Sequence, residues 1–295
     1  MRASIPTGST SSWLPVFAIV SVLLSLAAPW PAAAQDEQPQ LEWMRGPGTA
    51  PIGDGLAEIE LGEEYVFLGP EDTQRMLELG GNPVNGTELA TVAPLSDAEQ
   101  WILIFEWSDI GYVEDDEGED LDANAILESL REGNAAANEE REKRGWSTIE
   151  IVGWQEPPYY DVSTHNLTWS IVGESVDGQS VNRLVKLLGR KGVMSATLVA
   201  DPMELDNAVA QVDTLLTAYR FQPGNTYAEF VPGKDRLAEI GLTALIAGGA
   251  GVALVKSGLL ARFWKVFVAG GAALVAGIGR LFGRGKKHDP AAPIG

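Results

Sequence analysis

Short runs of alternating apolar and polar residues predict the first strands of this chain. Capping and stop residues predict where the helices between them begin and end. A helix over residues 70–81 opens with Pro70 and two acids and stops at paired glycines. The longest soluble helix opens with acids and closes on basic residues, as its macrodipole favours. We predict strands at Leu56–Leu61, Glu64–Leu68 and Gln100–Trp107, and this helix at Leu121–Arg144.

Four more strands follow in a row, with a turn at Gly189–Gly192 before the last of them. Their ranges are Ser147–Trp154, Asn166–Val172, Val181–Arg190 and Gly192–Ala200. A helix over residues 201–219 then has Asp201 as its N-cap and Pro202 at its first position. Consecutive strands with a few packed helices predict an α+β domain over residues 35–236, built on a mainly antiparallel sheet.

The first 34 residues differ from this domain, because Arg2 is their one charged residue and Leu14–Pro29 is apolar. Ala32 and Ala34 occupy the small-residue positions of a cleavage site. We therefore predict that residues 1–34 are a signal peptide, cut before Gln35. An uncleaved N-terminal anchor is the alternative.

The C-terminal part has two uncharged stretches, Ile240–Val255 of 16 residues and Val266–Gly279 of 14 residues. The first covers ~24 Å as a helix, so it needs flanking residues to cross a ~30 Å hydrocarbon core. We predict a membrane anchor over residues 237–282, either one transmembrane helix or a helical hairpin, with a basic tail over 283–295. A buried core helix is the alternative.

Glycines and basic residues of the anchor predict its packing and orientation. Small faces allow the two stretches, or two copies of the protein, to approach closely, and Lys and Arg favour the cytoplasmic side. The main domain is then expected in the periplasm, at the bacterial inner membrane, with membrane lipid as a partner. The anchor residues are Gly248, Gly249, Gly251, Lys256, Arg262 and Lys265.

Charge separates the two regions further, because 40 acids and 13 Lys or Arg lie between Gln35 and Glu239. An acidic domain repels phosphate backbones, so we expect no nucleic-acid partner. The chain has no cysteine and only two histidines, and it lacks the common hydrolase, zinc-protease and P-loop motifs. We expect no cofactor.

An acidic run over residues 114–122 contains carboxylates that a calcium ion would need. Its spacing does not match an EF-hand, and a solvated loop that caps the following helix is the alternative interpretation. The candidate calcium ligands are Asp115, Asp116, Asp120 and Asp122.

The stretch Val152–Trp169 is rich in aromatic residues and contains Pro157–Pro158, which predicts a rigid corner held by ring burial. Its acids and histidine suggest proton transfer, whereas the missing nucleophile favours a structural corner whose best use is a binding rim. The candidate residues are Trp154, Glu156, Tyr159, Tyr160, Asp161 and His165.

Several blocks together resemble one family: "FLGPEDTQRMLELGGNP", "VGWQEPPYYDVSTHNLTW", "LLGRKGVMSATLVADP" and "YAEFVPGKDRLAEIGLTALIAGGAG". They are similar to bacterial membrane-anchored proteins catalogued as domain of unknown function 2167, over roughly residues 41–260. The resemblance implies an exported domain with a C-terminal anchor, and it brings no catalytic residues.

These features predict a membrane-anchored, non-enzymatic binding or accessory protein of the cell envelope, with a protein partner or self-association through its glycine-rich segment. The alternative is a periplasmic hydrolase that uses His165 with Glu156 or Asp161.

Overall fold

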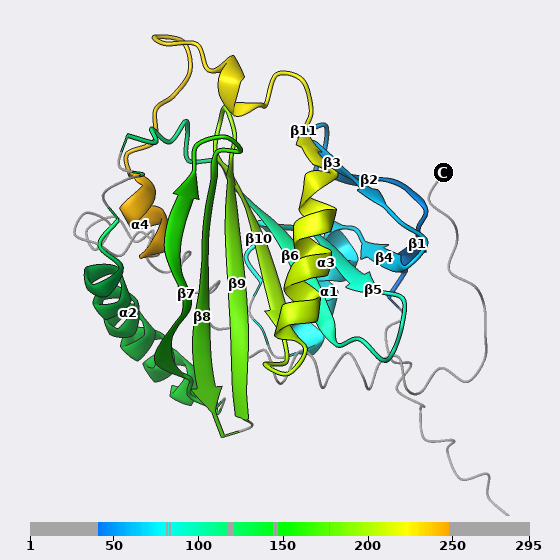
Figure 1. Cartoon of the computed structure of the whole chain (residues 1–295), viewed down its shortest axis with the longest axis vertical. Coiled ribbons are helices and arrows are strands. Elements are labelled where there is room, and N and C mark those ends of the chain that lie inside the picture. The colour runs from blue at the N-terminus through cyan, green and yellow to red at the C-terminus, as the bar shows by residue number, and fades with distance from the viewer. Residues whose placement is uncertain are drawn as a thin grey trace, which may run out of the picture. The chain divides into compact units, whose positions relative to one another are not determined.

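A computed structural model describes residues 41–247, apart from 81, 83, 117, 119, 120, 144, 146 and 177. Its main feature is an eight-stranded antiparallel sheet in the order β1-β4-β5-β6-β10-β9-β8-β7 (Figure 1). The predicted α+β class with a mainly antiparallel sheet is therefore correct. The strands are β1 Met44–Arg45, β4 Tyr65–Leu68, β5 Glu88–Pro94, β6 Trp101–Ser108, β7 Glu150–Asp161, β8 Asn166–Ser175, β9 Gly178–Leu188 and β10 Val193–Ala200.

One face of this sheet is covered by helix α3 and by a second, three-stranded sheet in the order β11-β3-β2. Together they enclose the largest hydrophobic cluster, which includes Phe105, Met194 and Val212. The covering elements are β2 Gly48–Ile52, β3 Ala57–Leu61, β11 Tyr219–Phe221 and α3 Leu205–Thr217.

The opposite face carries the other helices and two separate hydrophobic clusters. Helix α1, Pro70–Leu79, packs on β4 and β5. Helices α2, Ala123–Lys143, and α4, Leu242–Ile246, contribute to the cluster over β8 and β9. Every residue of β10 is buried, because both sides of the central strands are covered.

Strand β7 ends the sheet, and α2 satisfies its free carbonyl groups. Arg131 donates to the carbonyls of Ile151 and Val152, at 3.2 and 2.6 Å. Asn134 donates to the carbonyl of Ile149 at 2.6 Å. An uncovered edge strand would pair with other chains, so these side chains protect the fold from edge-to-edge association.

Pro157–Pro158 lies inside β7, where we had predicted a rigid turn. Proline removes a ladder donor and is tolerated on an edge strand or at a bulge, and the β7–β8 register shifts between Glu156 and Tyr159. The prediction of a turn was wrong, because two consecutive prolines fit a bulged edge strand as well as they fit a turn.

The predicted helix start at Asp201 was also wrong, because α3 begins at Leu205. Asp201 instead closes the preceding turn, where its Oδ1 accepts from the Met203 N–H at 2.8 Å. The predicted Gly189–Gly192 turn is confirmed, since it lies between β9 and β10.

The segment after β11 is fastened to the domain up to Ala247. Arg190, in the β9–β10 turn, donates from Nε to Asp235 Oδ2 at 2.7 Å. The backbone of Tyr112 bonds with the backbones of Arg236 and Ala238. Leu242 and Ile246 of α4 are 0% exposed, so the residues that we had predicted as the start of the anchor, 237–247, pack against the sheet.

Among the residues that the structure describes, no helix is long and apolar enough to cross a membrane. The signal-peptide prediction for residues 1–34 and the six anchor residues from Gly248 to Lys265 fall outside the described residues. These stay predictions, as does the basic tail.

Candidate functional site

At the end of the sheet where β7 turns into β8, Tyr160 and His165 meet Asp115 from the loop after β6. The Tyr160 hydroxyl donates to Asp115 Oδ2 at 2.7 Å and lies 3.1 Å from His165 Nδ1. His165 Nδ1 lies 3.4 Å from the same carboxylate oxygen. Because the phenol gives its one hydrogen to Asp115, a hydrogen bond with His165 requires a proton on Nδ1. The three groups form a closed triangle.

Two backbone features hold this triangle together. His165 has a φ of 54°, a left-handed conformation that is uncommon outside glycine. Gly118 lies so close to the Tyr160 ring that a Cβ there would be 2.6 Å from Cδ1. The acidic loop and the hairpin turn are therefore in direct contact, and a larger residue at position 118 would separate them.

The hydrogen bond between Tyr160 and Asp115 shifts the pKa values of both groups. Burial raises the pKa of Asp115, but hydrogen bonds from Tyr160 and His165 outweigh burial and lower it below the ordinary value. Burial and the Asp115 hydrogen bond raise the pKa of Tyr160. Asp115 is thus a stable carboxylate and Tyr160 a stable phenol near neutral pH.

A stack of four rings extends from the triangle. His165 packs on Tyr227 with ring centroids 4.3 Å apart, and Tyr227 stacks on Tyr112 at 4.4 Å. Tyr112 stacks on Phe230 at 3.9 Å. Tyr227 is anchored by its hydroxyl, which donates to the Val113 carbonyl at 2.8 Å. We call Phe230, Tyr112, Tyr227 and His165 the ring stack.

Sequence reasoning missed Tyr112, Tyr227 and Phe230, because Tyr112 is far in sequence from the segment that holds the other two and none belongs to a motif. Burial of Tyr227 raises the pKa of its phenol. The available signal was the density of aromatic residues in "TYAEF", at 226–230, which marks a loop held by ring packing.

The candidate corner residues separate in the structure. Tyr160 and His165 come together, as described above. Trp154 donates from Nε1 to the Ala123 carbonyl at 3.0 Å and fixes the start of α2. Tyr159 is 42% exposed, and because it alternates with Tyr160 along β7, its side chain points to the opposite face of the sheet.

The two carboxylates that the hydrolase alternative needs have other partners. Glu156 accepts a hydrogen bond from Arg183, which also pairs with Asp213 of α3 at 3.2 Å. Asp161 accepts from the backbone and hydroxyl of Ser163, at 2.8 and 2.7 Å. Neither hydrogen-bonds to His165 in the described part of the chain, so the geometry does not favour that alternative.

The candidate calcium ligands also have different roles. Asp122 Oδ1 accepts from the N–H groups of Asn124 and Ala125, both at 3.0 Å, and thereby caps α2. Asp115 belongs to the triangle, and Asp116 is exposed. Asp120 lies outside the described residues. Within the ranges described, no group of three or more acids or histidines has a metal-binding arrangement.

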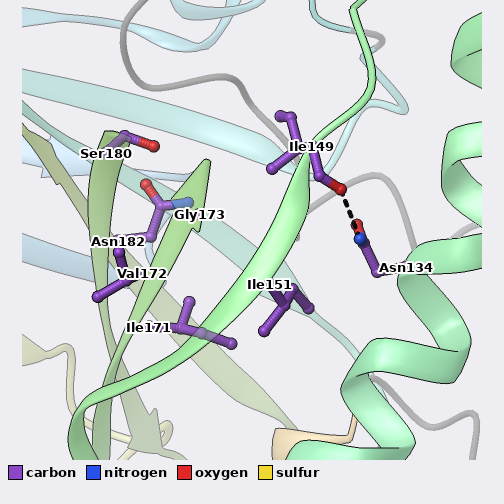
Figure 2. A pocket seen from close by; sticks show the side chains of 8 residues that line it. All are labelled: Asn134, Ile149, Ile151, Ile171, Val172, Gly173, Ser180 and Asn182. Atoms are coloured by element: carbon purple, nitrogen blue, oxygen red, sulfur yellow. Dashed lines mark hydrogen bonds between the residues drawn. The ribbon is translucent and has the colours of Figure 1, made fainter. Parts of the chain in front are cut away.

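A small cavity of about 10 Å³ lies between α2 and strands β7–β9 (Figure 2). Ile149, Ile151 and Ile171 line it, and Figure 2 shows Asn134 bonded to the Ile149 carbonyl at its side. A space of that size suits about one water molecule. We therefore interpret it as part of the packing of α2.

The fold and the site define a class: an α+β domain whose strand-end loops carry the ring stack, without an assembled catalytic set among the described residues. More particularly, the model of the family described as "Protein of unknown function (DUF2167)" matches residues 44–279, and the chain belongs to this family. The family seen in the sequence blocks is therefore confirmed, whereas the membrane anchor that the resemblance implies stays a prediction.

Comparison with other proteins does not identify an activity for this chain. No curated protein matches the chain. A solved structure, that of PsbP (CyanoP) from the cyanobacterium Synechocystis sp. PCC 6803, is similar over 65% of this chain and 99% of its own. The identity is 11% and the TM-score is 0.37, values that establish no common activity.

Proposed function

We propose that this protein is a non-enzymatic binding or accessory protein of the bacterial cell envelope. In this proposal it is exported and attached to the inner membrane by its C-terminal segment, and its ring stack with the adjoining hairpin turn contacts a partner protein. The ring stack carries the proposal. Aromatic residues are enriched at the centres of protein interfaces because they bury a large area with few rotatable bonds.

Exposed apolar residues beside the ring stack support a protein partner. Val162, in the hairpin turn, is 65% exposed. Leu237, which pairs by backbone with Tyr112, is 48% exposed. His165 itself is one-third exposed. A partner that covered these side chains would gain hydrophobic burial next to a preorganised polar triangle.

Site-specific photo-crosslinking in intact cells tests the contact. A photoreactive amino acid replaces Val162, in the turn before β8, or Val176, which follows the end of β8 and is 85% exposed. We expect a discrete crosslinked product from position 162 and none from position 176. Equal products from both positions, or none from position 162, would contradict a localised interface.

Fractionation tests the membrane attachment separately. The full-length chain should stay with the membrane through a high-salt wash and leave it only with detergent. Release by salt alone would refute the anchor and leave the crosslinking result standing.

A further inference from the structure

The loop between α1 and β5 contains the one Asn-Gly pair of the sequence, Asn85–Gly86. Gly86 is exposed and has a φ of 85°, a conformation that favours glycine. A Cβ at this position would meet nothing within 4 Å, so the backbone here is open. Glycine has no side chain to shield its amide nitrogen from the neighbouring Asn85 side chain. Bond formation between that nitrogen and the side-chain amide carbon would close a five-membered ring and expel ammonia.

Thr87 supplies two donors to the side-chain carbonyl of Asn85. The Thr87 N–H donates to Asn85 Oδ1 at 3.0 Å, and the Thr87 hydroxyl donates to the same oxygen at 2.5 Å. The first of these bonds closes a turn in which the side-chain carbonyl folds back over the Gly86 peptide. Both donors would stabilise a negative charge that develops on this oxygen, as the donors of an oxyanion hole do.

Glu88 holds the amide hydrogen of Gly86. Its Oε2 accepts from the Gly86 N–H at 2.9 Å, and its Oε1 accepts from the Asn85 N–H at 3.0 Å. Because both oxygens accept, the side chain is a carboxylate in this arrangement. Glu88 is 3% exposed, so packing fixes its position. It can take the proton of the planar Gly86 amide in the peptide plane, while the nitrogen attacks Asn85 from one face of that plane.

We propose that Asn85–Gly86 is a self-modifying site, at which the folded protein converts Asn85 to a succinimide. The Gly86 nitrogen bonds to Asn85 Cγ as Glu88 removes the Gly86 amide proton, and Thr87 holds the resulting oxyanion on Oδ1. When the oxyanion collapses, Nδ2 leaves with the proton from Glu88, so ammonia is released and Glu88 is again a carboxylate. Water then opens the ring at either carbonyl, which gives isoaspartate or aspartate.

The reaction changes the contacts of this loop. Either product adds a carboxylate close to Glu88, and isoaspartate also inserts a methylene into the backbone. Both changes weaken the bonds from the N–H groups of residues 85 and 86 to Glu88, in the first case because like charges repel. None of the reacting residues belongs to the ring stack, so this proposal and the proposed function stand or fail independently.

The rate of conversion in the folded and in the unfolded chain tests the proposal. The full-length protein in detergent, and the same protein in guanidinium chloride, are incubated at equal pH and temperature. Peptide mass spectrometry follows the replacement of the amide by a carboxyl group at position 85, and released ammonia is assayed. The folded protein should react faster by about tenfold or more, because only the native structure positions the base and the two donors. An equal or slower rate in the folded protein would overturn the proposal.

Variants separate the base from the donors. Thr87→Val keeps the side-chain shape and removes the hydroxyl, and Glu88→Gln keeps an acceptor for the N–H and removes the base. Each should slow the folded rate by about tenfold or more and leave the rate in denaturant unchanged. Glu78→Gln, the same change at an exposed position of α1, should leave both rates unchanged.

Circular dichroism identifies the variants that fold. If Glu88→Gln does not fold, Thr87→Val and the comparison between folded and unfolded protein decide the question. A folded variant at either position that converts Asn85 as fast as the unmodified protein contradicts the proposed roles and overturns the proposal.

Discussion

Glu106→Gln should make the protein more stable at neutral pH, because the native carboxyl is buried with little compensation. Burial raises the pKa of Glu106 from 4.5 to about 7, Lys186 opposes this rise, and Glu88 adds to it. Burial lowers the pKa of Lys186 to about 8, and Glu106 opposes that fall. Burial therefore disfavours the charged forms of both Glu106 and Lys186.

The sign of the pH dependence follows from proton binding. Between pH 4.5 and about 7 the folded protein holds the Glu106 proton more tightly than the unfolded chain does. The free energy of unfolding therefore falls as pH rises through this interval. At about 1.4 kcal/mol for each pH unit, the loss amounts to about 3 kcal/mol and is complete above about pH 7. A glutamine amide does not ionise, so the Glu106→Gln variant lacks this loss.

Urea unfolding of the full-length protein in detergent, followed by tryptophan fluorescence, measures the effect at several pH values. The stability of Glu106→Gln relative to the unmodified protein should increase by about 3 kcal/mol from pH 4.5 to 7. Glu114→Gln, at an exposed position, is the control and should show no such trend. A difference that stays constant with pH would refute the reasoning, whatever its absolute size.

Three further substitutions test the packing around the site. Arg131→Ala uncaps the β7 carbonyls and should increase concentration-dependent association in light scattering, unlike Arg75→Ala on α1. Tyr227→Phe leaves the ring and removes the bond to a buried carbonyl, so unfolding experiments should show a loss of about 1 kcal/mol. Gly111→Ala forces a Cβ to 2.7 Å from the Arg236 carbonyl oxygen at a φ of 97°, so limited proteolysis should cut the segment after β11 faster. Unchanged proteolysis would contradict tight docking of that segment.

Much of the fold could be predicted from local patterns. Strands β6, β8, β9 and β10 are rich in branched and aromatic residues, and α2 has Arg141 and Lys143 in its last turn, which suits its dipole. Strand β5 was missed because "ELATVAP" contains two alanines and ends in proline, residues that are depleted in strands. Strand β2 contains Pro51 and begins with a glycine, and it forms only because β3 pairs with it.

Less of the site could be predicted, because its contacts join distant segments. Tyr160 and His165 are five positions apart, so a corner that contains both was accessible from sequence. Asp115 reaches Tyr160 across 45 positions, and Tyr227 reaches Val113 across 114. The placement of Glu106 and Lys186 on either side of Ser195 also depends on strand order and register, because β10 lies between β6 and β9.

The burial of α4 has a mechanical consequence for the proposed attachment. Leu242, Leu245 and Ile246 lie in the same cluster as Trp169, so the chain is held against the domain up to this point. For the domain to rotate relative to the segment from residue 248 onward, these side chains must first leave the cluster. Exposing each of them to water costs about 1.5–3 kcal/mol. A load applied to the chain after Ala247 would therefore reach the hydrophobic cluster over β8 and β9 directly.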